Sequence, residues 1–390
     1  MKEGWEVKKL GDVCIIERGG SPRPINAYLT DSADGINWIK IGDASEGSKY
    51  ITSTKERIKP EGVKKSRMVH KGDFILSNSM SFGRPYILNI DGCIHDGWLV
   101  IHDKNNVFDK SYLYYYLGSP NIYREFQRLA VGGVVNNLNS ELVRNVQVAI
   151  PPLPEQSRIV EELDQLSNII EKKRQQLSEL DNLAQSIFYD MFGDPVTNEK
   201  GWEVKKLGEV CIIERGGSPR PISAFITNED NGVNWVKIGD AEEGSMYINS
   251  TKEKIKPEGV KKSRMVHKGD FILSNSMSFG KPYILGVDGC IHDGWLVIRD
   301  INRVFNKSYL YYYLGSKFIY NEFKRLAVGG VVNNLNSELV RGVLVAIPPL
   351  NLQQLFAQKI EAIEKEKELI KQSIKETEEL FNSRMDYYFG

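Results

Sequence analysis

The sequence contains the same long segment twice. Residues Gly4–Leu153 align with Gly201–Leu350 without gaps at a constant offset of 197 positions, and the two copies differ at only 27 of 150 positions. A period this long is far above that of a solenoid repeat, so each copy is expected to be a complete domain. Any fold for this chain therefore has to contain one domain twice.

A second segment follows each copy and is much less alike. Pro154–Gly193 and Asn351–Gly390 match at 8 of 40 positions, but they have the same length and both end in Phe-Gly. The junction between Gly193 and the second copy is short, polar and contains Pro195, as in a linker. We predict domains at 1–153 and 201–350, helical segments at 154–193 and 351–390, and a linker at 194–200.

The two helical segments carry heptads in which mostly apolar positions alternate steps of four and three. In the first they are Ile159, Leu163, Leu166, Ile170, Lys173, Leu177, Leu180, Ala184, Ile187 and Met191; in the second they are Phe356, Ile360, Ile363, Lys367, Ile370, Ile374, Thr377, Phe381, Arg384 and Tyr388. Such a helix needs a partner for its apolar face. We expect the two helices to pair antiparallel as a coiled coil around a pseudo-twofold axis, with one domain at each end. Homodimerisation is the alternative use of the same seam.

Each repeated segment combines strand and helix signals. Short β-type runs at 37–41, 73–77, 85–88 and 97–101 are separated by Gly, Asp and Asn, which predicts one strongly curved, mostly antiparallel sheet. Between Lys110 and Leu129 the apolar residues recur at spacings of three and four, interrupted at Gly118-Ser119-Pro120, which predicts two helices. The fold class is therefore α+β, as two α+β domains joined by two long antiparallel coiled-coil helices.

The charge balance differs between the parts. The chain has 51 basic and 51 acidic residues, yet residues 1–153 carry 20 basic and 17 acidic side chains, and 194–350 carry 21 and 18. Seven Lys or Arg against two acids lie in Lys55–Lys71, and Lys252–Lys268 repeats that count. These basic patches are either solvated surface or phosphate-binding surface.

Several classes of function lack support in the sequence. No apolar run approaches a membrane span, so we expect a cytoplasmic protein with no membrane contact. Cys14, Cys93, Cys211 and Cys290 lack metal-site spacing, so we expect reduced core thiols and no metal. No nucleotide-binding, hydrolase or amino-methyltransferase motif is present.

Two polar features remain open. The pairs His95-Asp96 and His292-Asp293 resemble an acid/base pair, but they lack a nearby nucleophile, which favours a structural or DNA-facing role. Gly132-Gly133 is either a phosphate-binding backbone or a tight turn.

Three motifs carry a family resemblance. They are the Gly-Trp-Glu-Val-Lys-Lys-Leu-Gly that opens each copy, Ile-Pro-Pro-Leu-Pro-Glu-Gln at 150–156 before a long helix, and Met-Phe-Gly-Asp-Pro at 191–195. Together, and over the whole chain, they resemble the specificity subunit of Type I restriction-modification systems. In the second copy Asn351-Leu352-Gln353 replaces Pro-Glu-Gln. This departure leaves open whether partner subunits, which in that family dock on the long helices, dock equally at the two ends.

The resemblance implies a non-catalytic subunit with two target-recognition domains, each reading one half of a bipartite, gapped site in double-stranded DNA. It implies no cofactor in this chain. The helices would set the gap and dock two methyltransferase subunits, which bring S-adenosylmethionine chemistry to adenine, and restriction or translocase subunits can join. Since the two domains are nearly identical, we expect an interrupted palindrome.

The candidate DNA-binding residues come from three surface segments in each copy. Phosphate contacts are expected from Lys64, Lys65, Arg67, Lys261, Lys262 and Arg264, and base contacts from Arg18, Ser21, Arg23, Ser77, Asn78, Ser79, Arg215, Ser218, Arg220, Ser274, Asn275 and Ser276. A turn-stabilising role is the alternative for both base-reading loops. Differences between the copies cluster at Asn26–Ile36 against Ser223–Val233 and at Arg84 against Lys281. If Arg84 contacts guanine through its planar fork, Lys281 cannot reproduce that contact.

Two other readings compete with a DNA reader. One is a tandem enzyme, against which the missing motifs argue. The other is a coiled-coil scaffold that binds only proteins, against which the basic patches argue. Salt-dependent duplex binding separates the reader from the scaffold, whereas S-adenosylmethionine binding by the lone chain would favour an enzyme.

Overall fold

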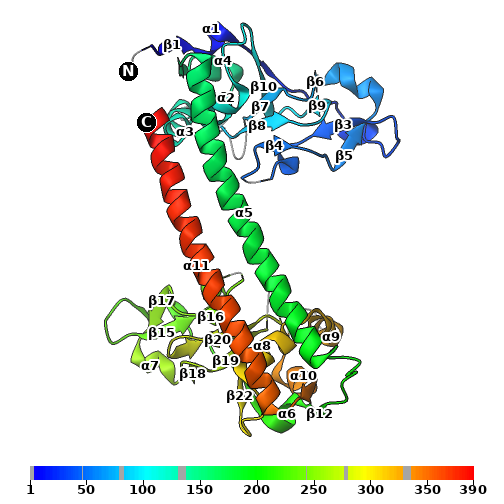
Figure 1. The fold of residues 1–390 in the computed structure, drawn as a ribbon, viewed down its shortest axis with the longest axis vertical. Coiled ribbons are helices and arrows are strands. Elements are labelled where there is room, and N and C mark those ends of the chain that lie inside the picture. The colour runs from blue at the N-terminus through cyan, green and yellow to red at the C-terminus, as the bar shows by residue number, and fades with distance from the viewer. Residues whose placement is uncertain are drawn as a thin grey trace. The chain divides into compact units, whose positions relative to one another are not determined.

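The structure, a computed structural model, describes residues 4–45, 47–78, 83–130, 138–242, 244–275, 280–327 and 335–390 (Figure 1). The chain forms two compact units. Unit 1 consists of Met1–Lys172 with Ser373–Gly390, and unit 2 consists of Lys173–Gln372. Each unit thus contains one repeated domain and segments of both long helices.

Within the residues that the structure describes, unit 1 contains eighteen short elements before the first long helix, with the 3-10 helices labelled η. They are β1 (Glu6–Lys9), α1 (Leu10–Val13), β2 (Cys14–Arg18), η1 (Ile25–Ala27), β3 (Ile36–Ile39), η2 (Ile41–Asp43), β4 (Tyr50–Ile51), β5 (Glu56–Ile58), η3 (Pro60–Lys65), β6 (Arg67–Val69), β7 (Phe74–Ser77), β8 (Pro85–Leu88), β9 (Gly92–Ile94), β10 (Trp98–Asp103), α2 (Lys110–Leu117), α3 (Pro120–Ala130), α4 (Ser140–Arg144) and β11 (Gln147–Ile150).

In the described part of unit 2 this order recurs, with the α-helix α7 in the place of η3 and one further strand, β14. Its elements are β12 (Glu203–Lys206), α6 (Leu207–Val210), β13 (Cys211–Arg215), η4 (Ile222–Ala224), β14 (Ile226–Thr227), β15 (Val233–Val236), η5 (Ile238–Asp240), β16 (Tyr247–Ile248), β17 (Glu253–Ile255), α7 (Pro257–Val260), β18 (Arg264–Val266), β19 (Phe271–Ser274), β20 (Pro282–Leu285), β21 (Gly289–Ile291), β22 (Trp295–Asp300), α8 (Lys307–Leu314), α9 (Lys317–Ala327), α10 (Ser337–Arg341) and β23 (Leu344–Ile347).

The expectation of one sheet per domain is wrong. In unit 1 the strands form a sheet of order β2-β10-β7-β8-β4, a second of order β5-β3-β9-β6, and the pair β1-β11. The run at 37–41 therefore belongs to a different sheet from the other three predicted runs. Most pairings are antiparallel, but β3–β9 and β4–β8 are parallel. Turn residues mark where strands end, whereas they do not say which strand is the partner.

The two helices predicted between Lys110 and Leu129 are confirmed as α2 and α3. The Asp109 carboxylate caps α2 by accepting the backbone N–H groups of Ser111 and Tyr112. α2 ends before Gly118, and α3 begins at Pro120, because proline at the first helical position needs no hydrogen-bonded N–H. The α+β class is thereby confirmed for each unit.

Two 40-residue helices, α5 (Leu153–Phe192) and α11 (Leu350–Phe389), pack together in both units (Figure 1). In unit 1, Arg384 and Tyr388 of α11 contact Glu162 of α5, and Tyr388 also contacts Arg158. Later residues of α11 contact earlier residues of α5, so the two helices run antiparallel.

The predicted heptad positions form the covered face of both helices. Every one of them is buried or half-buried. In unit 2 the seam includes Lys367, which is 4% exposed and lies 2.8 Å from both Asp181 and Glu364. A buried ammonium between two carboxylates keeps its charge, and these partners outweigh burial and raise the pKa of Lys367.

The long helices also complete the domain cores. In unit 1 the Phe389 ring of α11 lies 5.7 Å from Tyr112 and 5.5 Å from Tyr116 of α2. In unit 2 the corresponding Phe192 of α5 lies 4.7 Å from Tyr309 of α8. Each domain is thus fixed to the helix end beside it by aromatic contacts.

The four cysteines are free and buried, as expected. Burial raises the pKa of Cys14 and of Cys211 to about 12, so neither is a thiolate at neutral pH. Among the residues described, no helix is both long and apolar enough to cross a membrane.

Candidate nucleic-acid interface

The predicted arginine loop, residues 18–23, leaves β2 and crosses the turn between β9 and β10. A Cβ on Gly19 would lie 2.3 Å from the backbone oxygen of His95, so only glycine allows this approach. The Gly19 N–H donates to the Trp98 carbonyl at 2.9 Å, and the Gly20 N–H to the Ile94 carbonyl at 3.1 Å. The glycine pair therefore clamps the loop onto the turn that holds Asp96.

Asp96 organises the side chains of this region. Its carboxylate accepts the Ser21 hydroxyl at 2.8 Å, and it lies 3.0 Å from His95 Nε2 and 3.7 Å from Arg23. Its backbone oxygen accepts Arg18 Nε at 2.9 Å and Asn78 Nδ2 at 3.0 Å. The structure thus brings four of the predicted base-reading residues around one aspartate.

The second copy has the same arrangement around Asp293. Ser218 donates to its carboxylate at 2.8 Å, Arg220 lies 3.6 Å away, and Arg215 Nε donates to its backbone oxygen at 2.9 Å. Asn275 Nδ2 donates to the same backbone oxygen at 3.1 Å. Both units therefore present one loop geometry.

The charges in this cluster are well defined. Burial opposes ionisation of Asp96, but the Ser21 hydroxyl, His95 and the two arginines outweigh it and hold its pKa below the ordinary value. The pKa of Asp293 is lowered in the same way. Burial lowers the pKa of His95, and its Nδ1 accepts the Gly97 N–H at 2.9 Å, which fits a neutral ring with its proton on Nε2.

Three basic residues per copy border the arginine loop. Lys64 and Lys65 end η3 and are exposed, and a Cβ on Gly20 would lie 3.0 Å from the Lys65 carbonyl oxygen. Arg67 begins β6, donates to the Arg18 carbonyl at 2.8 Å and pairs with Glu17 at 3.0 Å. The predicted phosphate-binding and base-reading segments are therefore adjacent.

Unit 2 keeps these positions. Lys261 and Lys262 are exposed, and Arg264 pairs with Glu214 at 2.9 Å and donates to the Arg215 carbonyl at 3.3 Å. Adjacent exposed lysines and arginines at one loop can contact phosphates without reading sequence.

The divergent segment Asn26–Ile36 touches this basic surface. Lys65 Nζ donates to the Tyr28 hydroxyl at 2.6 Å, whereas Lys262 lies over the ring of Phe225 at 4.8 Å. Lys65 also lies over the Tyr28 ring, at 5.0 Å, so both lysines make a cation–π contact and the Tyr28 hydroxyl adds a hydrogen bond in unit 1.

The Ser/Asn loop is placed differently from the arginine loop. Ser77 is 1% and Asn78 2% exposed, with Ser274 and Asn275 at the same values. The Ser77 hydroxyl accepts the Arg84 N–H at 3.0 Å, and Ser274 does the same for Lys281 at 2.9 Å. These side chains lie inside the domain, where they stabilise the turn. Ser79, Ser276 and Gly132-Gly133 lie outside the described residues.

Arg84 and Lys281, in contrast, are both exposed. The backbone N–H of each donates to the buried serine hydroxyl of its own copy. At this position a guanidinium in one copy is replaced by an ammonium in the other.

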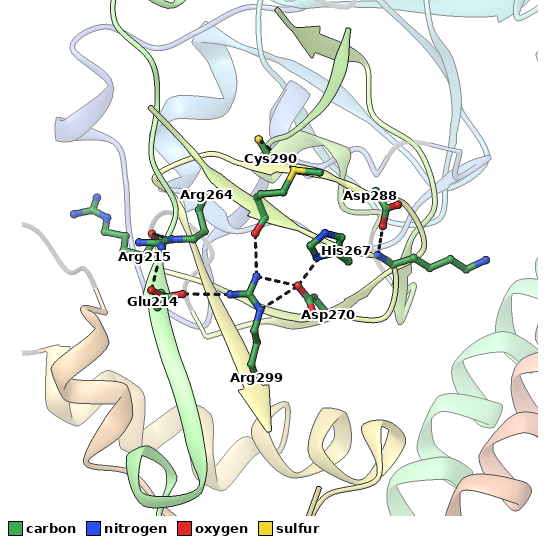
Figure 2. Close-up of polar contacts among 10 residues, drawn as sticks. Glu214, Arg215, Arg264, His267, Asp270, Asp288, Cys290 and Arg299 are labelled. Carbon is green, nitrogen blue, oxygen red and sulfur yellow. Dashed lines mark hydrogen bonds and ion pairs between the residues drawn. The ribbon is translucent and has the colours of Figure 1, made fainter. Parts of the chain in front are cut away.

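A further difference between the copies lies beside Arg264, at Arg299 (Figure 2). In unit 2, Arg299 of β22 donates to Glu214 at 3.2 Å, to Asp270 at 3.1 Å and to the Met265 carbonyl at 2.9 Å. Glu214 also pairs with Arg264. The Arg299 guanidinium thus joins β13, β18 and Asp270, the residue before β19. In unit 1 the counterpart is His102, whose Nδ1 lies 3.7 Å from Asp73.

Within the described ranges, no group of three or more His, Cys, Asp or Glu side chains could hold a metal ion. His95 and His292 are fixed by hydrogen bonds to their own turns. The structure therefore defines a class of protein: a duplicated α+β domain that presents a basic loop twice.

Comparison with known families identifies that class further. The family model of the Type I restriction modification DNA specificity domain matches residues 2–182 and 199–379. The chain therefore belongs to this family of DNA-specificity subunits, which are non-catalytic.

Known relatives span nearly the whole chain. The putative type I restriction enzyme MjaX specificity subunit of Methanocaldococcus jannaschii is 24% identical over 97% of this chain and 90% of its own length. The MjaVIII specificity subunit of that organism is 23% identical over 96% and 91%.

Two solved structures share the fold. A chain from a study of complex assembly and conformational transition of the type I R-M system has a TM-score of 0.62 at 19% identity, covering 100% of this chain and 98% of its own. The type I S subunit from M. genitalium has a TM-score of 0.54 at 12% identity, covering 98% and 95%.

Proposed function

We propose that each domain reads one half of a bipartite, gapped site in double-stranded DNA. The observation that carries this is the arginine loop, which is built identically in the two units around Asp96 and Asp293. Two readers with the same side chains in the same geometry favour the same bases. The target is therefore an interrupted palindrome, with one half-site on each strand.

The contacts divide into two kinds. Lys64, Lys65 and their copies contact phosphates, because exposed ammonium groups position a protein without reading sequence. The exposed guanidinium groups of Arg18 and Arg23 are available for guanine O6 and N7. Ser77, Asn78 and their copies position the loop from inside the domain.

One base pair of the palindrome is proposed to be read unequally. Arg84 can present a planar fork of donors to guanine, whereas Lys281 offers a single charged group. The half-site read by unit 2 then tolerates more than one base at that position.

The helices are proposed to set the gap and to dock two adenine methyltransferase subunits. α5 and α11 expose apolar side chains on their solvent faces, among them Leu183, which is 48% exposed, and Leu380, which is 49% exposed. Exposed leucines on a charged helix favour a protein partner. The partner binds S-adenosylmethionine, this chain binds no cofactor, and restriction or translocase subunits complete the complex.

Duplex binding by the purified chain tests this function. The affinity for a mixed-sequence DNA duplex should fall steeply between about 50 and 200 mM salt, since several phosphates are neutralised. Selection from a random duplex pool should then enrich a gapped palindrome. Absence of duplex binding favours the coiled-coil scaffold, and S-adenosylmethionine binding by the chain alone favours an enzyme.

A further inference from the structure

The two units differ at the junction between each domain and the long helix that follows it. In the domains, Lys49 of unit 1 corresponds to Met246 of unit 2. In the helices, Ile170 of α5 corresponds to Lys367 of α11. A lysine and an apolar residue have thus exchanged places between the domain and the helix, and each unit keeps one lysine at these two positions. We call Lys49 and Lys367 the junction lysines.

In unit 1 the junction lysine comes from the domain. Lys49 directly precedes β4, its side chain is 15% exposed, and its Nζ lies 2.8 Å from the Asp164 carboxylate of α5. The same Nζ lies 5.0 Å from the centre of the Tyr115 ring, and the Tyr115 hydroxyl donates to Asp164. Ile170 is buried. The ammonium of Lys49 therefore joins the domain to α5 about three turns after the helix begins.

In unit 2 the junction lysine comes from the helix. Lys367 Nζ lies 2.8 Å from both Glu364 of α11 and Asp181 of α5. It also donates to the Gly244 carbonyl of the domain at 3.4 Å. Met246, two residues further along, is buried in an apolar cluster to which α11 contributes. The domain and both helices of unit 2 therefore meet at this ammonium.

One tyrosine marks the same place in both units, since Tyr115 of α2 corresponds to Tyr312 of α8. Burial raises the pKa of Tyr115, and its hydrogen bond to Asp164 raises it further. Burial also raises the pKa of Tyr312, and the charges of Glu364 and Asp181 add to this shift. The carboxylates that hold the junction lysine therefore lie beside the same tyrosine in each unit. A second lysine at this place would bring two like charges together at a site partly shielded from water.

The junction lysine is a second attachment of the domain to its helix. The first attachment is Gln156, which is fully buried and bonds the backbone of Val107, Asp109 and Pro151. The contact of Lys49 lies about two turns, or about 12 Å, further along α5. A domain attached to a rigid helix at one point can tilt about that point, whereas two points separated along the helix fix its angle.

Unit 2 has the same two attachments. Gln353 makes the three bonds to the backbone that Gln156 makes in unit 1. Lys367 lies about four turns, or about 21 Å, further along α11. The angle between domain and helix is therefore fixed over a longer distance in unit 2 than in unit 1.

We propose that Lys49 and Lys367 are positioning residues that fix the angle at which each domain presents its arginine loop, and so determine how strictly the gap of the DNA site is read. This inference rests on the proposed function, under which the domains read half-sites and the helices set the gap. One base-pair step advances about 3.4 Å along the duplex, so a tilt that moves the loop by a few ångströms reaches the neighbouring gap lengths. The junction lysines act in this way without contacting DNA.

A first experiment tests whether the two positions share one ammonium site. Met246→Lys places a second ammonium beside Lys367 and should lower the unfolding temperature by about 3 °C or more. Lys367→Ile gives α11 the residue that α5 has. In that background Met246→Lys should lower the unfolding temperature by less than half as much, because its ammonium replaces the one removed. Equal shifts in the two backgrounds would overturn the inference and leave the proposed function intact.

A second experiment measures gap preference by fluorescence anisotropy. The probes are the duplex that the wild-type chain selects from a random pool and two versions with the gap one base pair shorter or longer. The wild-type chain should prefer its own gap by about 10-fold or more, and Lys49→Met should reduce this preference to about 3-fold or less. Lys49→Arg retains a cation and should keep the wild-type preference.

The chain provides a matched control and a second route to the same result. Lys8→Met removes a lysine that pairs with Glu6 on the exposed surface of β1, and it should keep the wild-type gap preference. Met246→Lys should reduce the preference from unit 2, and Met246→Lys combined with Lys367→Ile should restore it.

The results that contradict the inference are distinguishable from a failure of the proposed function. If Lys49→Met and Met246→Lys weaken binding to all three duplexes by the same factor, or leave binding unchanged, the junction lysines do not set the angle. The inference is then overturned and the proposed function stands. If the wild-type chain selects no gapped duplex, the proposed function fails and the inference fails with it.

Discussion

Replacing Asp96 by alanine removes the acceptor around which the arginine loop of unit 1 is built. The Ser21 hydroxyl loses a hydrogen bond of 2.8 Å to a carboxylate, and His95 Nε2 loses a charged neighbour at 3.0 Å. A hydrogen bond to a charged group contributes about 1.5–3 kcal/mol, and the lower end applies because the Asp96 side chain is 30% exposed. We expect loop ordering to lose about 2 kcal/mol, which lowers the affinity for the cognate duplex about 30-fold.

The repeat supplies the internal check on this prediction. Asp293→Ala should have the same effect through the other half-site, and the double variant should lose about 4 kcal/mol, since distant sites add. Asp91→Ala is the control in unit 1, because Asp91 accepts the Lys71 N–H at 2.7 Å in a separate turn. Fluorescence anisotropy on the duplex provides the readout. A folded Asp96→Ala chain with wild-type affinity would refute the assignment of the arginine loop to DNA.

Three further outcomes follow from differences and contacts within the units. His102→Arg should reproduce the Arg299 network in unit 1 and stabilise it by about 0.5–1 kcal/mol, and Arg299→His should destabilise unit 2 by a similar amount, measured by thermal unfolding; no shift in either variant contradicts the network. Gln156→Leu should lower the free energy of unfolding in urea by about 3 kcal/mol or more, since the backbone groups of Val107, Asp109 and Pro151 lose their buried hydrogen-bond partner. Gln353→Leu should do the same in unit 2. A loss under about 1 kcal/mol would show that water replaces the amide. Because the pKa of His95 is lowered in the folded chain, the unfolded chain takes up the proton first as pH falls. The contribution of His95 to the free energy of unfolding should therefore be constant above about pH 6.5 and decline below it. His95→Gln should weaken that decline in unfolding experiments at different pH.

Local periodicity predicted the helices, because it depends only on residues near one another in sequence. The alternating steps from Ile159 to Met191 placed the covered face of α5, and the break at Gly118-Ser119-Pro120 placed the end of α2. The partition of strands into two sheets depends on which distant strands pair. The short runs, including β3 at Ile36–Ile39, carry no signal for that choice.

The candidate site was predicted in part for the same reason. Arg18 and Arg23 are exposed and lie together, as the polar loop suggested, whereas Ser77 and Asn78 are buried. In the sequence His95-Asp96 resembles an acid/base pair, whereas the role of Asp96 as organiser depends on contacts far apart in sequence. The Gly19-Gly20 pair is the sequence signal for the contact with the Asp96 turn, since paired glycines in a loop indicate that another backbone comes close.

The central claim is that two nearly identical domains read the same half-site. Sequencing N6-methyladenine in cells that express this chain with its methyltransferase subunit tests it most directly. The account predicts one gapped palindrome methylated on both strands, with relaxed specificity at no more than one position of one half. Two unrelated half-sites would contradict it.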